Sequence, residues 1–221
     1  MNHPYLNPHL RNNDKHAYFS HKIGVSGAAK VDFLNESVKE TAKQLGKEIA
    51  RHGAVLINGA TTGFPYYVAA GAKENRGICL GMSPAENEAE HVGVYGLPLD
   101  YMDVITYTGF GYAGRDLLFT RSCDALILGP GRVGTIHEFT IAFEDKKPIG
   151  ILQSPEWESD KLLKTIIDQS HRQGESGPII FESDPSVLVQ KLIVLIDESR
   201  KKRYTYKNGD GVGGEKGTLI M

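Results

Sequence analysis

The sequence predicts an α/β fold: an open, doubly wound, mainly parallel sheet of Rossmann-like type with helices on both faces. Short apolar runs alternate along the chain with longer segments of helical periodicity. The apolar runs are continuous rather than alternating, which is typical of parallel strands that are buried on both faces. Glycine-rich turns follow several of these runs, as expected where strands lead into crossover helices.

The chain begins with a polar segment, residues 1–20, that we interpret as an extended arm. The first apolar run, at 22–27, predicts the first strand. Residues 34–53 then predict a helix, which Gly53 ends at the place expected for a C-terminal cap. Its apolar stripe is formed by Leu34, Val38, Leu45 and Ile49.

The next elements repeat this alternation. Residues 54–58 predict the second strand, "GATTG" a turn, and residues 64–77 the second helix. The run at 78–82 predicts the third strand. Residues 83–100 have no regular pattern, and we interpret them as a loop that could cover a site.

The second half continues the pattern. Strands are expected at 102–108, 123–129, 148–152 and 177–181, and helices at 109–122, 134–147, 158–174 and 184–200. Residues 21–199 therefore form a single expected domain. The glycine-rich, basic segment at 200–221 predicts a flexible tail.

Composition restricts the function classes. The chain has 221 residues and a formal net charge of -2, so no global field favours nucleic acid or a membrane surface. No apolar run has the length of a membrane span, and the N-terminus lacks the apolar core of a signal peptide. Cys79 and Cys123 lie in apolar runs, which favours buried, reduced thiols in a cytoplasmic protein.

A metal site is not predicted. The histidines near the N-terminus have neither zinc-site spacing nor an accompanying cysteine pair. They are His3, His9, His16 and His21.

The glycine-rich turns predict the position of a ligand site, because ligands of open parallel sheets bind beyond the carboxyl ends of the strands. Gly27 and the segments 58–63, 107–115 and 129–135 all follow predicted strands and fall on that edge. A glycine-rich turn that leads into a helix offers backbone N–H groups beside the positive end of the helix dipole. This arrangement indicates a phosphate site.

Three side chains on this edge are candidates for a role in ligand binding or catalysis. Thr135 and Glu138 share one face at the start of a helix, and Thr135 offers a hydroxyl and an N–H to phosphate. Alternatively, the two residues form a capping box with Thr135 as the cap. Arg115 lies at the start of the preceding helix, on the same edge. Alternatively, it is a surface arginine on an exposed turn without a role in the site.

Residues 115–152 resemble the signature half of the Lonely Guy family of cytokinin-activating phosphoribohydrolases. The family hallmark, P-G-G-x-G-T-x-x-E preceded by an arginine, matches Pro130 to Glu138 with Arg115 before it. Residues 55–84 resemble the G-G-G-x-x-G-L-M segment of the family more weakly. The likeness covers residues 22–195.

The chain departs from the hallmark at several positions. Arg132 replaces the second glycine, Asp116 replaces the lysine that usually follows the family arginine, and the G-G-G turn reads Gly59, Ala60, Thr61. These features are similar to the sister branch that contains molybdenum-cofactor carrier proteins and other nucleotide-binding relatives.

The resemblance implies a ligand site and two candidate catalytic residues, with no metal and no required cofactor. Its phosphate-binding or ligand-binding residues would be Gly59, Thr61, Thr62, Gly63, Pro130, Gly131, Arg132, Val133, Gly134 and Thr135. In an enzyme, water would cleave the N-glycosidic bond of a nucleoside 5′-monophosphate to free base and ribose 5-phosphate. Glu138 would stabilise the cationic sugar, and Arg115 would orient Glu138.

A second function class stays open: a carrier or sensor that binds a nucleotide or a molybdenum-cofactor-like phosphorylated ligand without turnover. Arg132 and Asp116 favour this class, whereas the Arg115–Glu138 pair favours the enzyme. In either case the resemblance implies a homodimer or a higher homo-oligomer. A dehydrogenase is not indicated, because "GVSGAAK" after the first strand is not a G-x-G-x-x-G fingerprint.

Overall fold

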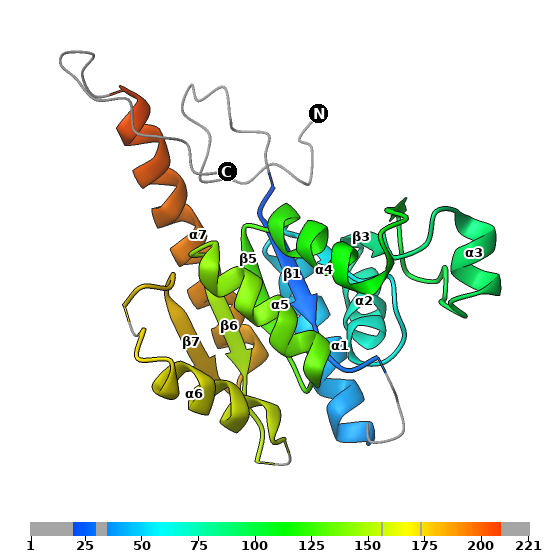
Figure 1. Cartoon of the computed structure of the whole chain (residues 1–221), viewed down its shortest axis with the longest axis horizontal. Coiled ribbons are helices and arrows are strands. Elements are labelled where there is room, and N and C mark those ends of the chain that lie inside the picture. The colour runs from blue at the N-terminus through cyan, green and yellow to red at the C-terminus, as the bar shows by residue number, and fades with distance from the viewer. Residues whose placement is uncertain (1–19, 30–34, 156, 173, 209–221) are drawn as a thin grey trace.

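The computed structural model describes residues 20–29, 35–155, 157–172 and 174–208 (Figure 1). Residues 1–19 of the expected arm, Leu34 of the expected stripe and residues 209–221 of the expected tail lie outside these ranges. Within them the chain alternates strands and helices from end to end.

The described strands form one open sheet in which every pairing is parallel, in the order β4-β3-β2-β1-β5-β6-β7. This confirms the predicted fold class. The order places β1 at the centre, and the chain reverses its direction of travel across the sheet between β1 and β5. The strands are β1 (Lys22–Ser26), β2 (Val55–Asn58), β3 (Ile78–Ser83), β4 (Val104–Tyr107), β5 (Ala125–Leu128), β6 (Ile149–Leu152) and β7 (Ile179–Glu182).

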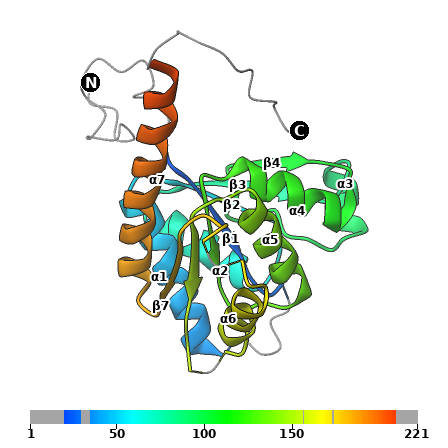
Figure 2. The same cartoon turned by 60° about the vertical axis from the view of Figure 1, so that its left-hand side comes forward.

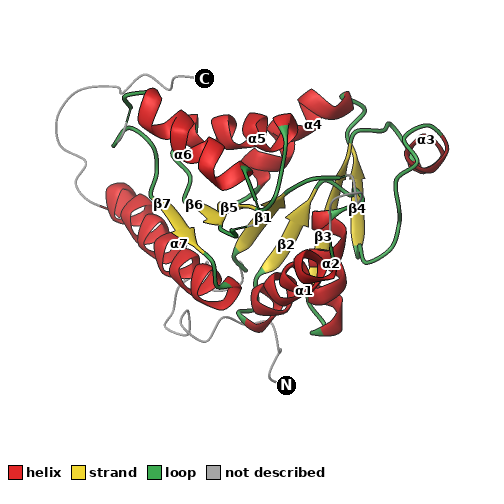
Figure 3. Cartoon of the chain, turned by 90° about the horizontal axis from the view of Figure 1, so that it is seen from below, coloured by secondary structure: helices red, strands yellow, loops and turns green. Residues whose placement is uncertain are grey.

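Helices cover both faces of the sheet (Figure 3). One layer contains α1 (Glu36–Arg51), α2 (Phe64–Glu74) and α7 (Pro185–Asn208). The other contains α4 (Gly111–Ser122), α5 (Val133–Glu144) and α6 (Ser159–Gln169). None of the helices in the described ranges is long and apolar enough to cross a membrane.

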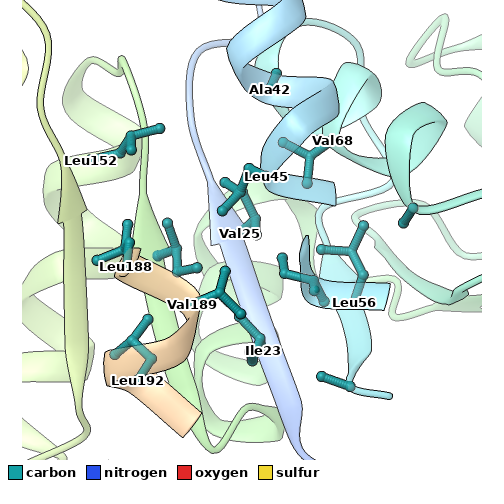
Figure 4. Close-up of a cluster of buried hydrophobic side chains, with 14 of the residues drawn as sticks. Ile23, Val25, Ala42, Leu45, Leu56, Val68, Leu152, Leu188, Val189 and Leu192 are labelled. Carbon is teal, nitrogen blue, oxygen red and sulfur yellow. The ribbon is translucent and has the colours of Figure 1, made fainter. Parts of the chain in front are cut away.

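The apolar strands bury side chains on both faces, as their continuous patterns predict. On one face Ile23, Val25 and Leu56 pack with Leu45 of α1 and Leu188 of α7 (Figure 4). The opposite cluster contains Phe119, Leu126, Phe139 and Leu163 from α4, β5, α5 and α6. These two layers hold the carboxyl ends of the strands in fixed positions.

Two elements differ from the sequence expectation. The segment expected to be an irregular loop contains the short helix α3 (Glu88–Gly93), which lies beyond the β4 edge of the sheet (Figure 3). The Asn87 side chain caps it by accepting a hydrogen bond from the Glu90 N–H at 3.0 Å. The last helix, α7, continues past Arg200 to Asn208, and its end extends beyond the sheet (Figure 2). Part of the expected tail is therefore helical.

Candidate functional site

Backbone hydrogen bonds connect the loops that follow β1, β2 and β5. The Ala28 N–H donates to the Pro130 carbonyl at 2.6 Å, and the Phe64 N–H donates to the Ala28 carbonyl at 2.9 Å. The Thr62 hydroxyl donates to the Ala29 carbonyl, also at 2.6 Å. These bonds fix three glycine-bearing turns against one another at the carboxyl edge of the sheet.

A cavity of about 470 Å³ opens between these turns. Its position at the carboxyl edge, where the strand order reverses, is the usual ligand position in open parallel sheets. The loop after β1 contributes residues 27–29, and the segment before β4 contributes Tyr95, Gly96 and Leu97. Helix α4 contributes Tyr112, Arg115 and Asp116.

Most of the residues singled out from the sequence line this cavity. They are Gly59, Thr61, Thr62, Arg115, Arg132, Gly134, Thr135 and Glu138. Gly63, Pro130, Gly131 and Val133 are not among the lining residues. Gly63 has a φ of +77° at the N-cap of α2, Pro130 supplies the carbonyl that accepts from Ala28, and the Val133 side chain is 79% exposed.

Glu138 projects from α5 toward the end of β1. The Ser26 hydroxyl donates a short hydrogen bond to its carboxyl group and lies 3.4 Å from the Thr135 hydroxyl. Glu138 and Thr135 are both buried, with 7% and 4% of their surface exposed. A substituent on Gly131 would lie 2.1 Å from the Thr135 hydroxyl, so glycine is needed beneath this side chain.

A second carboxylate, Asp116, faces Glu138 from α4. It lies 3.1 Å from Arg115 Nε and accepts a hydrogen bond from His137 Nδ1 at 2.9 Å. Burial, followed by the charge of Asp116, raises the pKa of Glu138 from 4.5 to about 8, while Arg115 and the Ser26 hydroxyl act in the opposite direction. Burial and the charge of Asp116 both favour the protonated form of the Glu138 carboxyl group.

Arg115 is a buried residue and not the surface arginine of the alternative interpretation, since only 7% of it is exposed. Its Nε atom is buried without a hydrogen-bond partner among the described residues, although Asp116 is near enough for an ion pair. The guanidinium lies over Gly59, where an added Cβ would fall 1.6 Å from Nη1. The glycine at position 59 is thus explained by the close approach of Arg115.

The capping-box alternative for Thr135 and Glu138 is wrong. Helix α5 begins at Val133 with Arg132 as its N-cap, and this residue makes no side-chain cap hydrogen bond. Thr135 lies inside the first turn, so Glu138 is one turn too far along to close a capping box. Both side chains point toward the cavity instead.

Several cavity residues were not singled out by the sequence analysis as ligand-site residues. Ser26, Asp116, Tyr95 and Tyr112 all line the cavity. A signal existed for Ser26, which is a polar residue at the last position of an apolar strand. No local pattern distinguishes Tyr95 or Tyr112 from other tyrosines, because their position depends on the packing of distant segments.

No group of three or more histidine, cysteine or acidic side chains able to hold a metal was found in the described part of the chain. His21, one of the histidines considered for metal, is buried and lies 2.7 Å from Asp197. Cys79 and Cys123 are buried and form no disulfide, and burial raises the pKa of the Cys79 thiol to about 12.

The chain matches a known protein family and is similar to other known proteins. A family model described as the SLOG cluster4 family matches residues 20–189, in agreement with the Lonely Guy resemblance of the hallmark loop. An uncharacterised protein of Archaeoglobus fulgidus is 34% identical over 134 residues, which cover 61% of this chain and 81% of that protein.

Two solved structures share the fold. The molybdenum cofactor carrier protein of Chlamydomonas reinhardtii is 27% identical with a TM-score of 0.62, covering 81% of this chain and 99% of that chain. The molybdenum cofactor binding protein of the phototrophic bacterium Rippkaea orientalis is 24% identical with a TM-score of 0.64, covering 80% of this chain and 98% of that chain. At 24% identity the second likeness concerns the fold alone.

Proposed function

The chain belongs to the SLOG cluster4 family, and from this premise we propose that it binds and releases a small phosphorylated ligand as a carrier or sensor. The ligand class is a nucleotide or a molybdenum-cofactor-like phosphate ester. The likeness to the Chlamydomonas carrier protein, at 27% identity over nearly its whole length, supports this class.

The chemistry of the cavity supports a phosphate at the start of α5. Gly134 and Thr135 lie in the first turn of α5, where backbone N–H groups are not used within the helix and the dipole is positive. The guanidinium of Arg132 adds a cation on the exposed side of the same turn. A volume of about 470 Å³ lies within the range typical of small-ligand sites.

The surroundings of Glu138, a buried carboxyl group beside the carboxylate of Asp116, favour binding over turnover. Cleavage of an N-glycosidic bond passes through a cationic sugar, which an ionised carboxylate stabilises. Here burial and the charge of Asp116 raise the pKa of Glu138 and so disfavour its ionised form, and the Ser26 hydroxyl donates to one of its oxygens. In its protonated form Glu138 acts as a neutral hydrogen-bonding group.

A phosphoribohydrolase is the second candidate function, because Arg115 and Glu138 line one cavity. Binding of a substrate that displaces Asp116 from Glu138 would lower the pKa of Glu138 and restore its charge. Glu138 would then face the developing cation, and Arg115 would orient it.

One experiment separates the two functions. The purified protein and its Glu138→Ala variant are incubated with a panel of nucleoside 5′-monophosphates, and free base is followed by chromatography. Ligand-dependent thermal stabilisation of both proteins without base release supports the carrier or sensor. Base release by the unaltered protein and not by the variant would overturn it in favour of the hydrolase. Mass spectrometry of the protein as purified identifies a ligand that stays bound.

We also propose a homodimer or a higher homo-oligomer. Phe119, Phe139 and Phe143 are buried in the core, so they do not supply its contact. The exposed apolar residues Phe110, Leu117 and Leu118, at the start of α4 and within it, are suitable for the contact. Light scattering during size-exclusion chromatography measures the oligomer directly.

A further inference from the structure

The cavity has two chemically different walls. The polar wall, described above, contains Ser26, Thr135 and Glu138 from β1 and α5. The other wall is formed by Tyr95, Gly96 and Leu97, together with Tyr112 of α4. A phosphate needs only the first wall, so the second wall is available to another part of a ligand.

The segment that supplies Tyr95 is held by buried polar contacts. His91 is fully buried, with Nδ1 lying 2.8 Å from the Ser83 hydroxyl and Nε2 lying 3.0 Å from the Pro98 carbonyl oxygen. Because a carbonyl only accepts, the proton is on Nε2 and the serine hydroxyl donates to Nδ1. The Leu97 N–H also donates to the His91 carbonyl at 3.0 Å. This network fixes Tyr95 beside α4.

The two tyrosine rings meet at the edge of the cavity. Their centroids are 5.4 Å apart at an interplanar angle of 84°, an edge-to-face arrangement. In an edge-to-face pair the partner ring covers only one of the four ring faces, so the pair itself does not prevent stacking of a third planar group. Tyr112 is 52% exposed, and the Arg115 guanidinium lies 5.8 Å from its ring centroid.

We propose that Tyr95 and Tyr112 form a subsite for a planar heteroaromatic ring carried by the phosphorylated ligand. The inference rests on the proposed function and adds the part of the ligand that the polar wall does not recognise. Stacking on tyrosine tolerates many ring types, so the shared chemistry is that of a nucleobase or a pterin. The Arg115 guanidinium is a planar cation that reaches both the aromatic wall and the polar wall.

Titration calorimetry on the full chain tests the subsite with probes that differ in the ring. Ribose 5-phosphate carries the phosphate without a ring, AMP and GMP add a nucleobase, and 6-hydroxymethylpterin monophosphate offers a pterin. We expect at least one ring-bearing probe to bind about tenfold more tightly than ribose 5-phosphate, the size of one base–aromatic stack. The tighter of the two ring classes identifies the source of the ring.

Variants assign the effect to the two rings. Tyr95→Ala and Tyr112→Ala should each reduce the preference for the ring-bearing probe about tenfold while leaving the affinity for ribose 5-phosphate unchanged. Tyr95→Phe and Tyr112→Phe keep the ring and should keep the preference. Tyr101→Ala is the matched control, because Tyr101 makes a similar ring pair with Tyr66, at 5.0 Å, and neither lines the cavity.

The outcomes show whether the subsite alone is wrong or the proposed function is wrong as well. Equal affinity for ribose 5-phosphate and all ring-bearing probes would overturn the subsite and leave phosphate binding intact. An unchanged preference in both alanine variants, with the fold confirmed by circular dichroism, would overturn it as well. Failure of every phosphorylated probe to bind would overturn the proposed function and the subsite together.

Discussion

The protonated state of Glu138 predicts a specific dependence of stability on pH. The carboxyl group has a pKa of about 8 in the folded protein and an ordinary value of 4.5, so the folded state binds this proton more tightly. The stabilisation from the bound proton is complete below pH 4.5 and is lost as the pH rises through about 8. Over that interval the free energy of unfolding should fall by several kcal/mol.

Replacing Glu138 with glutamine isolates this contribution. Glutamine has the shape of the protonated side chain, can accept from the Ser26 hydroxyl and can donate to Asp116, but it does not ionise. We expect Glu138→Gln to match the unaltered protein at about pH 5 and to exceed its free energy of unfolding by several kcal/mol at about pH 9. Urea unfolding at a series of pH values measures both curves.

A control variant tests whether the loss of any one carboxylate would change the free energy of unfolding in the same way. Glu40→Gln deletes one exposed carboxylate from α1 and should shift the free energy of unfolding by less than about 0.5 kcal/mol at every pH. If the curves of Glu138→Gln and the unaltered protein stay parallel from about pH 5 to about pH 9, Glu138 carries no raised pKa. Glu138 would then be ionised at neutral pH, as cleavage through a cationic sugar requires.

Three further predictions follow from single contacts. Gly59→Ala places a Cβ 1.6 Å from Arg115 Nη1, so it should displace the guanidinium and weaken binding of a ring-bearing phosphorylated probe in calorimetry while the far-UV circular dichroism stays native. Phe119→Ala empties a fully buried position and should lower the free energy of unfolding in urea by about 3–5 kcal/mol. Asn35→Ala removes the side chain that accepts from the Val38 N–H at 2.9 Å, and should cost about 1 kcal/mol in the same assay. Native stability of Phe119→Ala or Asn35→Ala, or native binding by Gly59→Ala, would contradict the contact concerned.

The sequence was sufficient to predict the parallel sheet and the edge of the sheet at which the cavity lies. Continuous apolar runs can be recognised without tertiary information, and parallel strands bring their following loops to one edge. This reasoning placed Arg115, Thr135 and Glu138 near one another although Arg115 and Glu138 come from different helices. The cavity in the structure is lined by all three.

The remaining features depend on packing that no local pattern encodes. The alternative of a capping box failed because Arg132, which has no ordinary capping side chain, occupies the N-cap. Helix α3 was missed because it is short and buries only His91, so it has no apolar stripe. The burial of Asp116 arises between α4 and α5, where Arg115 and His137 surround it.

Asp116 stands where the Lonely Guy hallmark usually has a lysine, so the cavity contains a carboxylate in place of a cation. A lysine beside Arg115 would add a second cation and would favour an ionised Glu138. The carboxylate at this position instead pairs with the Arg115 guanidinium and raises the pKa of Glu138. Attraction for a phosphate is then left to the N-terminus of α5 and to Arg132, at the mouth of the cavity rather than at its buried end. Such a distribution favours holding the ligand by its phosphate, while the carboxylate of Asp116 is paired with Arg115 and Glu138 is disfavoured as an ion, and this suits reversible binding better than bond cleavage.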